Sequence, residues 1–149
     1  MYTANRIVDN LYIGGMPPYG HALADAGIKV LVLCAAENQD AQLYPGVRVI
    51  VAPGDDDPRP GRFSRFVDMW VKASDEVAKC VSMGEPTLVT CMAGQNRSGF
   101  VVAMALRKLT GWSGRRTVEY VQSHRLHALN NTTFANYVID SFPIEKPIG

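Results

Sequence analysis

The chain has 149 residues, 47% of them hydrophobic, and a formal net charge of +1. This length predicts one domain spanning residues 1–149, and the apolar fraction is ample for a core. A charge near zero provides no overall field that attracts nucleic acid or an anionic membrane, so we expect neither as a partner. Any affinity for phosphate must therefore come from a local site.

Cysteine and histidine usage argues against a disulfide scaffold and a metal site. Cys34, Cys80 and Cys91 form no Cys-x-x-Cys pair, which is typical of a reduced intracellular protein. His124 and His127 lack a third ligand at a recognisable spacing. The first residues show no signal-peptide pattern, and no apolar run approaches the ~18 residues of a membrane span. We expect a cytoplasmic protein with no metal and no other cofactor.

The first half of the chain predicts strands with one short helix. Apolar runs indicate strands over residues 7–13, 30–33 and 47–51, and residues 19–26 predict a helix that Gly27 ends. The segment after the third strand, residues 53–61, is rich in proline, glycine and aspartate, which predicts a loop.

The second half predicts mostly helices. An apolar stripe indicates a long amphipathic helix from Phe63 to near Gly84. We then expect a strand, a helix, a helix capped by Ser113 and a helix capped by Thr132, over residues 86–90, 99–109, 113–125 and 132–142. This order predicts an α/β fold in which helices flank a central, mixed, mostly parallel sheet.

The most informative segment is residues 91–98, which read Cys-Met-Ala-Gly-Gln-Asn-Arg-Ser between a predicted strand and a predicted helix. A cysteine attacks as its thiolate, and because a free thiol has a pKa of about 8.5 it needs nearby positive potential to ionise. Loop N–H groups, the helix N-terminus near Ser98 and the forked guanidinium of Arg97 provide that potential and bind phosphate oxygens. The segment predicts a nucleophile, Cys91, in a phosphate-binding loop of Met92, Ala93, Gly94, Gln95, Asn96 and Arg97.

Other interpretations of this loop have less support. A Cys-x5-Arg pair also arises by chance, and the alternative is a buried core cysteine beside an arginine that only caps a helix. The preceding strand, Gly94 and the following apolar helix favour the phosphate site. A nucleotide P-loop requires lysine where Phe100 stands, and the chain has no Gly-x-Ser-x-Gly motif of a serine hydrolase.

Phosphate-ester chemistry also needs a proton donor for the leaving oxygen. Asp55, Asp56 and Asp57 follow a predicted strand and precede the long helix, which is a suitable place for one. If the loop is extended, Asp55 points toward the phosphate, Asp56 points away, and Asp57 is turned outward by Pro58. We therefore expect Asp55 to be the acid. The alternative is that the three carboxylates form only a solvated turn.

Residues 88–99 resemble the signature loop of the cysteine-dependent protein tyrosine phosphatases, in their compact dual-specificity branch. Residues 5–14, 29–34 and 125–131 are similar to the opening strands and the closing segment of that branch. The resemblance implies a dual-specificity fold and hydrolysis of phosphomonoesters through a cysteinyl-phosphate, on phosphotyrosine and also on phosphoserine or phosphothreonine. The family usually has histidine where this chain has Thr90.

The resemblance also implies roles for individual residues. It makes Cys91 the nucleophile, Arg97 the phosphate ligand and Asp55 the general acid, and it gives Ser98 a role in the departure of the thiolate. For Ser98 the alternative is a helix N-cap. The stretch around Cys34 is similar to the lipid-phosphatase branch related to tensin, in which such a cysteine forms a reversible disulfide with the nucleophile. The alternative for Cys34 is a small buried apolar residue.

Three alternatives to a protein phosphatase remain open. Residues 95–100 are similar to a run in RNA 5′-triphosphatases of the same superfamily, although the near-neutral charge argues against a long RNA track. A phosphoinositide phosphatase uses the same chemistry. The alternative from another functional class is a pseudophosphatase, which binds phosphate without turnover. The reason to consider it is Thr90, which stands in place of the usual histidine.

Overall fold

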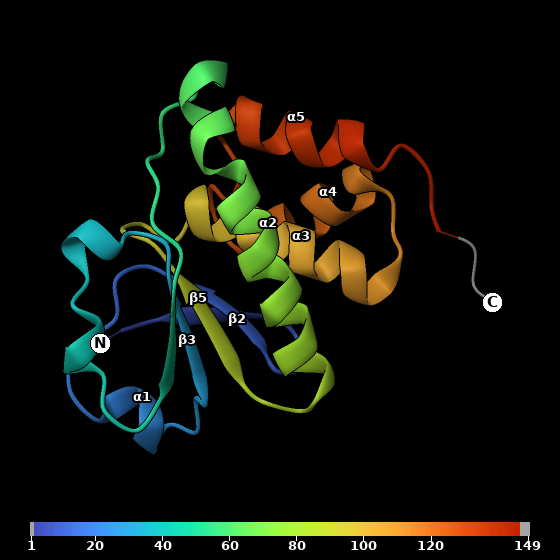
Figure 1. Ribbon diagram of the computed structural model, residues 1–149. Helices are drawn as coiled ribbons and strands as arrows, with labels where there is room; N and C mark the ends of the chain where they lie inside the picture. Colours follow the sequence, from blue (N-terminus) through green and yellow to red (C-terminus); the bar gives the residue numbers. More distant parts are fainter. Residues whose placement is uncertain (1, 147–149) are drawn as a thin grey trace.

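The computed structural model describes residues 2–146, and its centre is a five-stranded sheet in the order β1-β2-β5-β3-β4 (Figure 1). The first pair of strands is antiparallel and all the others are parallel. The strands are β1 (Ala4–Val8), β2 (Leu11–Gly14), β3 (Val30–Leu33), β4 (Arg48–Val51) and β5 (Thr87–Thr90). The prediction of an α/β fold with a mixed, mostly parallel sheet is confirmed.

The prediction of one strand over residues 7–13 is wrong, because this segment folds back on itself as the β1–β2 hairpin. Its turn contains Asn10 at a φ of 67°, a left-handed conformation that asparagine tolerates well. Ile7, Leu11 and Ile13 are all buried. The alternating apolar pattern thus continues across the turn, and periodicity alone did not reveal the reversal.

Four longer helices gather on one face of the sheet, and the short α1 (Ala22–Asp25) lies on the other (Figure 1). They are α2 (Pro60–Ser82), α3 (Arg97–Thr110), α4 (Gly114–His124) and α5 (Thr132–Ser141). Ser113 caps α4 as predicted, since its Oγ accepts from Arg116 N–H at 3.2 Å. The cap of α5 is Asn131 rather than Thr132. No helix within residues 2–146 has the length and apolar character needed to span a bilayer.

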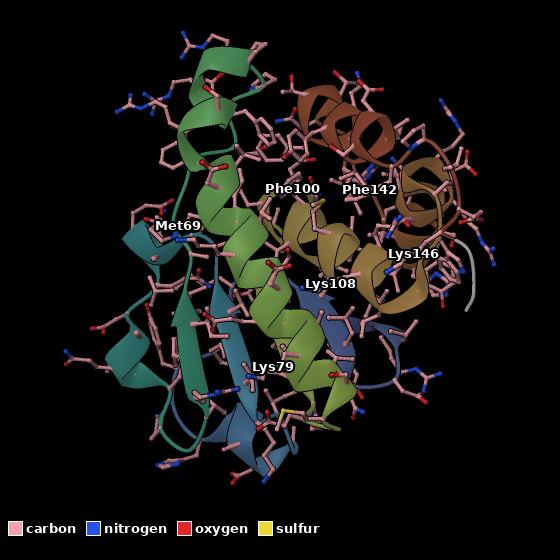
Figure 2. All side chains as sticks on the ribbon, turned by 45° about the vertical axis from the view of Figure 1, so that its right-hand side comes forward. Met69, Lys79, Phe100, Lys108, Phe142 and Lys146 are labelled. Carbon is pink, nitrogen blue, oxygen red and sulfur yellow. The ribbon has the colours of Figure 1, made fainter. Side chains whose placement is uncertain are left out.

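The core forms two layers because successive side chains of a strand face opposite sides of the sheet. Leu31, Leu33 and Leu88 pack with α1, whereas Val32 and Val89 pack beneath the four helices. Between those helices, the rings of Phe63, Trp70, Phe100 and Phe134 lie 4.9 to 6.1 Å apart, with Phe100 where α2, α3 and α5 meet (Figure 2).

The aromatic cluster also fixes the acidic loop at the edge of the sheet. The indole N–H of Trp70 donates to the carbonyl of Ala52 at 2.9 Å, directly after β4. A side chain at Gly54 would collide with Trp70, since its Cβ would lie 2.3 Å from the ring. The loop that carries the three aspartates therefore starts from a rigid support beside the carboxyl ends of β3 and β5.

Candidate active site

The loop between β5 and α3 turns its carbonyl groups away from its centre. Each of the four carbonyl oxygens of residues 92–95 accepts a hydrogen bond from a group outside the loop. The donors are Met16 N–H to Met92 (3.1 Å), Arg125 Nη2 to Ala93 (3.0 Å), Arg125 Nε to Gly94 (3.1 Å) and Leu129 N–H to Gln95 (3.1 Å). The N–H groups of residues 92–97 have no acceptor anywhere in the described part of the chain. This is the arrangement of an anion-binding loop.

Glycine is required at the middle of this loop for two reasons. Gly94 has a φ of 69°, which side chains disfavour, and its Cβ would lie 2.4 Å from the carbonyl carbon of Gly14. A Cβ at the neighbouring Gly15 would lie 2.9 Å from the Met92 oxygen. The end of β2 and the loop therefore pack backbone against backbone.

Cys91 lies at the carboxyl end of the central strand β5, and its side chain is buried. Its Sγ is 3.2 Å from Ser98 Oγ in the first turn of α3. Ser98 is not the N-cap of this helix, because α3 begins at Arg97 and the cap position belongs to Asn96. The Ser98 hydroxyl is thus free to contact the thiol, and the positive end of the α3 dipole faces it.

Arg97 is buried at the start of α3, and one of its guanidinium nitrogens donates hydrogen bonds to two acceptors. Its Nη1 donates to Glu37 Oε1 at 2.8 Å and to the Gly54 carbonyl at 3.0 Å. Its Nε is buried without an acceptor among the described residues. An unpaired buried donor is costly, so the open edge of the guanidinium is suited to a phosphate oxygen. Sequence analysis missed Glu37, because no local motif marks a residue that reaches Arg97 from another loop.

The three aspartates of the acidic loop have different partners. Asp55 pairs with Arg62 of α2, whose Nε lies 3.1 Å away. Asp57 accepts from Arg59 Nε at 2.9 and 3.0 Å, and these hydrogen bonds lower the pKa of Asp57 to about 2. The pair with Arg59 thus favours the ionised form of the Asp57 carboxyl over the protonated form that a general acid needs. Neither Asp55 nor Asp57 makes a hydrogen bond or ion pair with residues 91–98.

Asp56 is the aspartate that reaches the phosphate loop. Its two carboxylate oxygens accept from the amides of Asn96 and Asn131, each at 3.1 Å. The prediction that Asp56 points away is therefore wrong. Asp57 N–H donates to Asp55 Oδ1 at 3.3 Å, so the Asp55 carboxylate is held by its own loop while that of Asp56 is held by the two asparagines. The two asparagines were not recognised as partners of the acidic loop, although Asn96 lies inside the predicted motif.

Cys34 is the buried neighbour of Cys91 on the adjacent strand. Leu33 of β3 is in register with Thr90 of β5, and Cys34 N–H continues the ladder by donating to the Thr90 carbonyl at 2.9 Å. Burial, and then the charge of Cys91, raise the pKa of Cys34 well above its ordinary value of 9.0. Cys34 therefore remains a neutral thiol, in agreement with Cys91 as the nucleophile of the pair.

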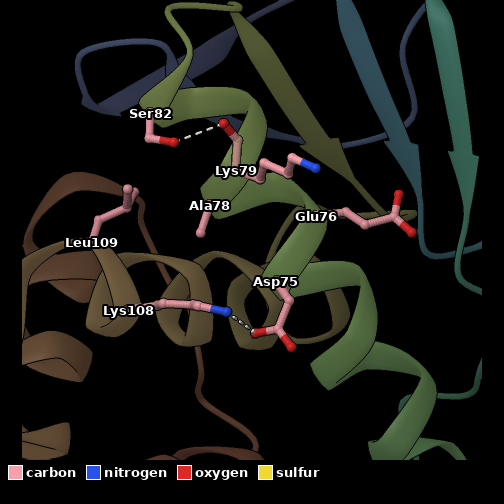
Figure 3. A pocket seen from close by; sticks show the side chains of 7 residues that line it. All are labelled: Asp75, Glu76, Ala78, Lys79, Ser82, Lys108 and Leu109. Atoms are coloured by element: carbon pink, nitrogen blue, oxygen red, sulfur yellow. Dashed lines mark hydrogen bonds and ion pairs between the residues drawn. The ribbon is translucent and has the colours of Figure 1, made fainter.

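A second hollow in the surface, of about 630 Å³, lies between α2 and the end of α3 (Figure 3). Its Lys108 is paired with Asp75, with Nζ and Oδ1 3.0 Å apart. It contains neither a cysteine nor an open guanidinium. This hollow therefore lacks the groups that the expected phosphate chemistry requires.

No protein-family model matches the chain. It is 31% identical to the protein tyrosine phosphatase PRL-1 of Leishmania major over 133 residues, which cover 85% of this chain and 75% of that protein. The chain belongs to the protein tyrosine phosphatase family. The expectation of a cysteine-dependent phosphatase is thereby confirmed.

Solved structures agree with this membership. A mouse protein that carries the description dual specificity phosphatase, solved with zinc tungstate, superimposes with a TM-score of 0.71 at 25% identity, covering 93% of this chain and 87% of that one. Human DUSP28 superimposes with a TM-score of 0.72 at 24% identity over 93% of each chain. This tyrosine phosphatase thus has the fold of the dual-specificity branch.

The positions of Cys34 and Cys91 predict a reversible disulfide. Adjacent strands are about 5 Å apart, within the Cα separation that a disulfide spans. Peroxide should oxidise the Cys91 thiolate to a sulfenic acid, and the Cys34 thiol should then displace water to form the S–S bond. Activity should fall on peroxide treatment and return with dithiothreitol, and peptide mapping should find a Cys34–Cys91 link.

The matched control is Cys80→Ser, since Cys80 lies in α2 and should not affect recovery. Cys34→Ser should lose the reversible component, because the unprotected sulfenic acid oxidises further. Equal recovery in Cys34→Ser and the parent chain, with no linked peptide, would contradict the prediction.

Proposed function

We propose that residues 1–149 form one phosphatase domain that hydrolyses phosphomonoesters through a phosphocysteine on Cys91. The observation that supports this most strongly is the loop after Cys91: the carbonyls of residues 92–95 are all bonded to groups outside the loop, while the N–H groups of residues 92–97 and the Nε of Arg97 have no acceptor among the described residues. These donors match the three terminal oxygens of a phosphate group. The thiol of Cys91 lies at the base of the same loop.

In the first step, the loop amides and Arg97 hold the phosphate, and the Cys91 thiolate attacks phosphorus opposite the leaving oxygen. Charge on the phosphoryl oxygens is stabilised by donors that are already oriented. We propose Asp56, rather than Asp55, as the acid that protonates the leaving oxygen. Its contact with Asn96 supports this assignment, whereas Asp55 and Asp57 are each paired with an arginine.

In the second step, water attacks the phosphocysteine and Cys91 departs as a thiolate. Asp56, now ionised, accepts a proton from that water. The hydroxyl of Ser98, 3.2 Å from the sulfur, donates to the departing thiolate. The three cysteines are free, and a thiol nucleophile needs a reducing compartment, which supports a cytoplasmic location.

The charge around the loop favours a substrate with one phosphate group. The side chains of Met92, Ala93, Gln95 and Asn96 are uncharged, and the adjacent acidic loop contributes the carboxylate of Asp56, since Asp55 and Asp57 are paired with Arg62 and Arg59. Neighbouring phosphates of a phosphoinositide or of an RNA 5′-triphosphate would be repelled there and would find no extra cation in the loop. We therefore propose phosphotyrosine in proteins as the first substrate, and phosphoserine and phosphothreonine as further ones.

Replacing the nucleophile and its arginine tests the proposed function. Cys91→Ser should reduce hydrolysis of a phosphotyrosine peptide to background yet still bind tungstate, because the amides and Arg97 remain. Arg97→Lys should weaken tungstate binding by about tenfold or more, since an ammonium cannot replace the bidentate fork. Phosphate release and calorimetric titration with tungstate measure the two effects.

Undiminished hydrolysis by Cys91→Ser would contradict the nucleophile assignment. A variant of Lys108, which is paired in the distant hollow, is the control and should change neither quantity. The same release assay with a phosphoinositide and a triphosphate-ended RNA tests the substrate class. Faster release from either of these would overturn that class and leave the nucleophile assignment intact.

Single substitutions in the acidic loop identify the acid. Asp56→Asn should lower turnover of a phosphotyrosine peptide by about a hundredfold, the usual scale of general-acid catalysis. The defect should shrink for aryl phosphates with acidic phenols, which leave without protonation. Asp57→Asn and Asp55→Asn remove exposed or half-exposed ion pairs and should cost less than about fivefold. The measurement is the turnover of each variant with a series of aryl phosphates, plotted against the pKa of the leaving phenol.

A large defect in Asp55→Asn that depends on the leaving group would return the role to Asp55, as the sequence predicted. The same defect in Asp57→Asn would show that the Arg59 pair opens when substrate binds. Either result would exclude Asp56 as the acid.

A further inference from the structure

Thr90, which replaces the usual histidine before the nucleophile, makes two hydrogen bonds inside the protein. Its hydroxyl donates to the Val32 carbonyl at 2.9 Å and accepts from Gln39 Nε2 at 3.0 Å. Thr90 is fully buried and Gln39 is 4% exposed. Adjacent side chains of a strand face opposite sides, so Thr90 points away from the sheet face that Cys91 occupies. The hydroxyl therefore has no direct contact with the thiol.

Gln39 connects Thr90 to the turn that follows β3. The amide oxygen of Gln39 accepts from Ala35 N–H at 3.0 Å, and its nitrogen holds Thr90. The short 3₁₀ turn Ala36–Asn38 lies between Ala35 and Gln39, so the hydrogen bond between them closes the turn. One buried side chain thus links both ends of the turn to the central strand.

Glu37 is in the middle of this turn and its side chain is 51% exposed. An exposed carboxylate is weakly constrained by its own surroundings, so the backbone of the turn decides where it lies. From this turn Glu37 reaches Arg97 Nη1 at 2.8 Å. Together with the Gly54 carbonyl at 3.0 Å, this contact orients the guanidinium and its open Nε edge.

We propose that Gln39 and Thr90 form a positioning pair that sets the orientation of Arg97 through Glu37. The inference rests on the proposed function, because it concerns how the same loop binds phosphate. The pair takes the place of the family's histidine and acts on oxyanion affinity. The positive potential at the Cys91 thiol comes from the loop amides, the α3 N-terminus and the charge of Arg97, and a changed orientation of the guanidinium does not remove that charge. Gln39 and Thr90 touch neither the substrate nor the reacting atoms.

Two buried substitutions test the pair. Gln39→Leu and Thr90→Val keep the approximate shape but remove the hydrogen bonds, and each should weaken tungstate binding about tenfold and raise KM for an aryl phosphate. The pH profile of Cys91 alkylation by iodoacetamide should not move. Thr90→Ser keeps the hydroxyl, so its tungstate affinity should stay close to that of the parent chain, unlike that of Thr90→Val. Gln42→Leu, an exposed glutamine of the same segment, is the matched control.

A double-mutant cycle separates positioning from a general loss of structure. If Gln39 acts through Glu37, Gln39→Leu should cause no further loss of tungstate affinity in a Glu37→Gln chain. Additive losses, unchanged tungstate affinity in both single variants, or a shifted alkylation profile would overturn the inference. These outcomes are independent of the proposed function, which is tested separately by hydrolysis in Cys91→Ser.

Discussion

The site depends on the outward bonding of the loop carbonyls between β5 and α3. The carbonyls of four consecutive residues, 92–95, are satisfied from outside the loop, and the N–H groups of residues 92–97 have no acceptor among the described residues. Arg125 supplies two of those bonds, and the backbone at Met16 and Leu129 supplies the others. Segments before and after the loop in the chain are thus required for its geometry, so the site depends on the tertiary fold and not on the motif alone.

The charges around the loop are arranged to suit one bound phosphate group. Arg97 is held on one nitrogen by Glu37 and Gly54, which leaves its other edge for an anion. Cys34 stays neutral beside Cys91 and adds no second negative charge to the site. The site therefore provides hydrogen-bond donors and one oriented guanidinium for a single phosphate, and it does so without any further cation in the loop.

Local signals in the sequence were sufficient for much of this account. The breaker-rich loop, the buried strand over residues 30–33 and the Cys91–Arg97 motif each depend on neighbouring residues, and all three are found in the structure. Ser113 was recognised as a cap for the same reason. Such features depend on residues close together in the sequence, where backbone sterics and apolar periodicity determine the local structure.

The failures concern contacts between distant segments. Asp56 reaches the loop because Asn131 holds it from the start of α5, 75 residues away in sequence. Glu37 reaches Arg97 across 60 residues, and Gln39 reaches Thr90 across 51. The hairpin at Asn10 was missed because the turn preserved the alternation of apolar residues. Such contacts are fixed by tertiary packing, which a single sequence does not display.

The most direct test of the central claim is detection of the phosphoryl group on Cys91 itself. Rapid quenching during turnover of an aryl phosphate with an acidic phenol, followed by mass spectrometry of the peptides, would locate it. The account predicts a phosphoryl group on the peptide that contains Cys91, with more of it in Asp56→Asn, where attack by water is slowed. Phosphate release with Cys91 unmodified throughout, or a phosphoryl group on Ser98, would contradict the account.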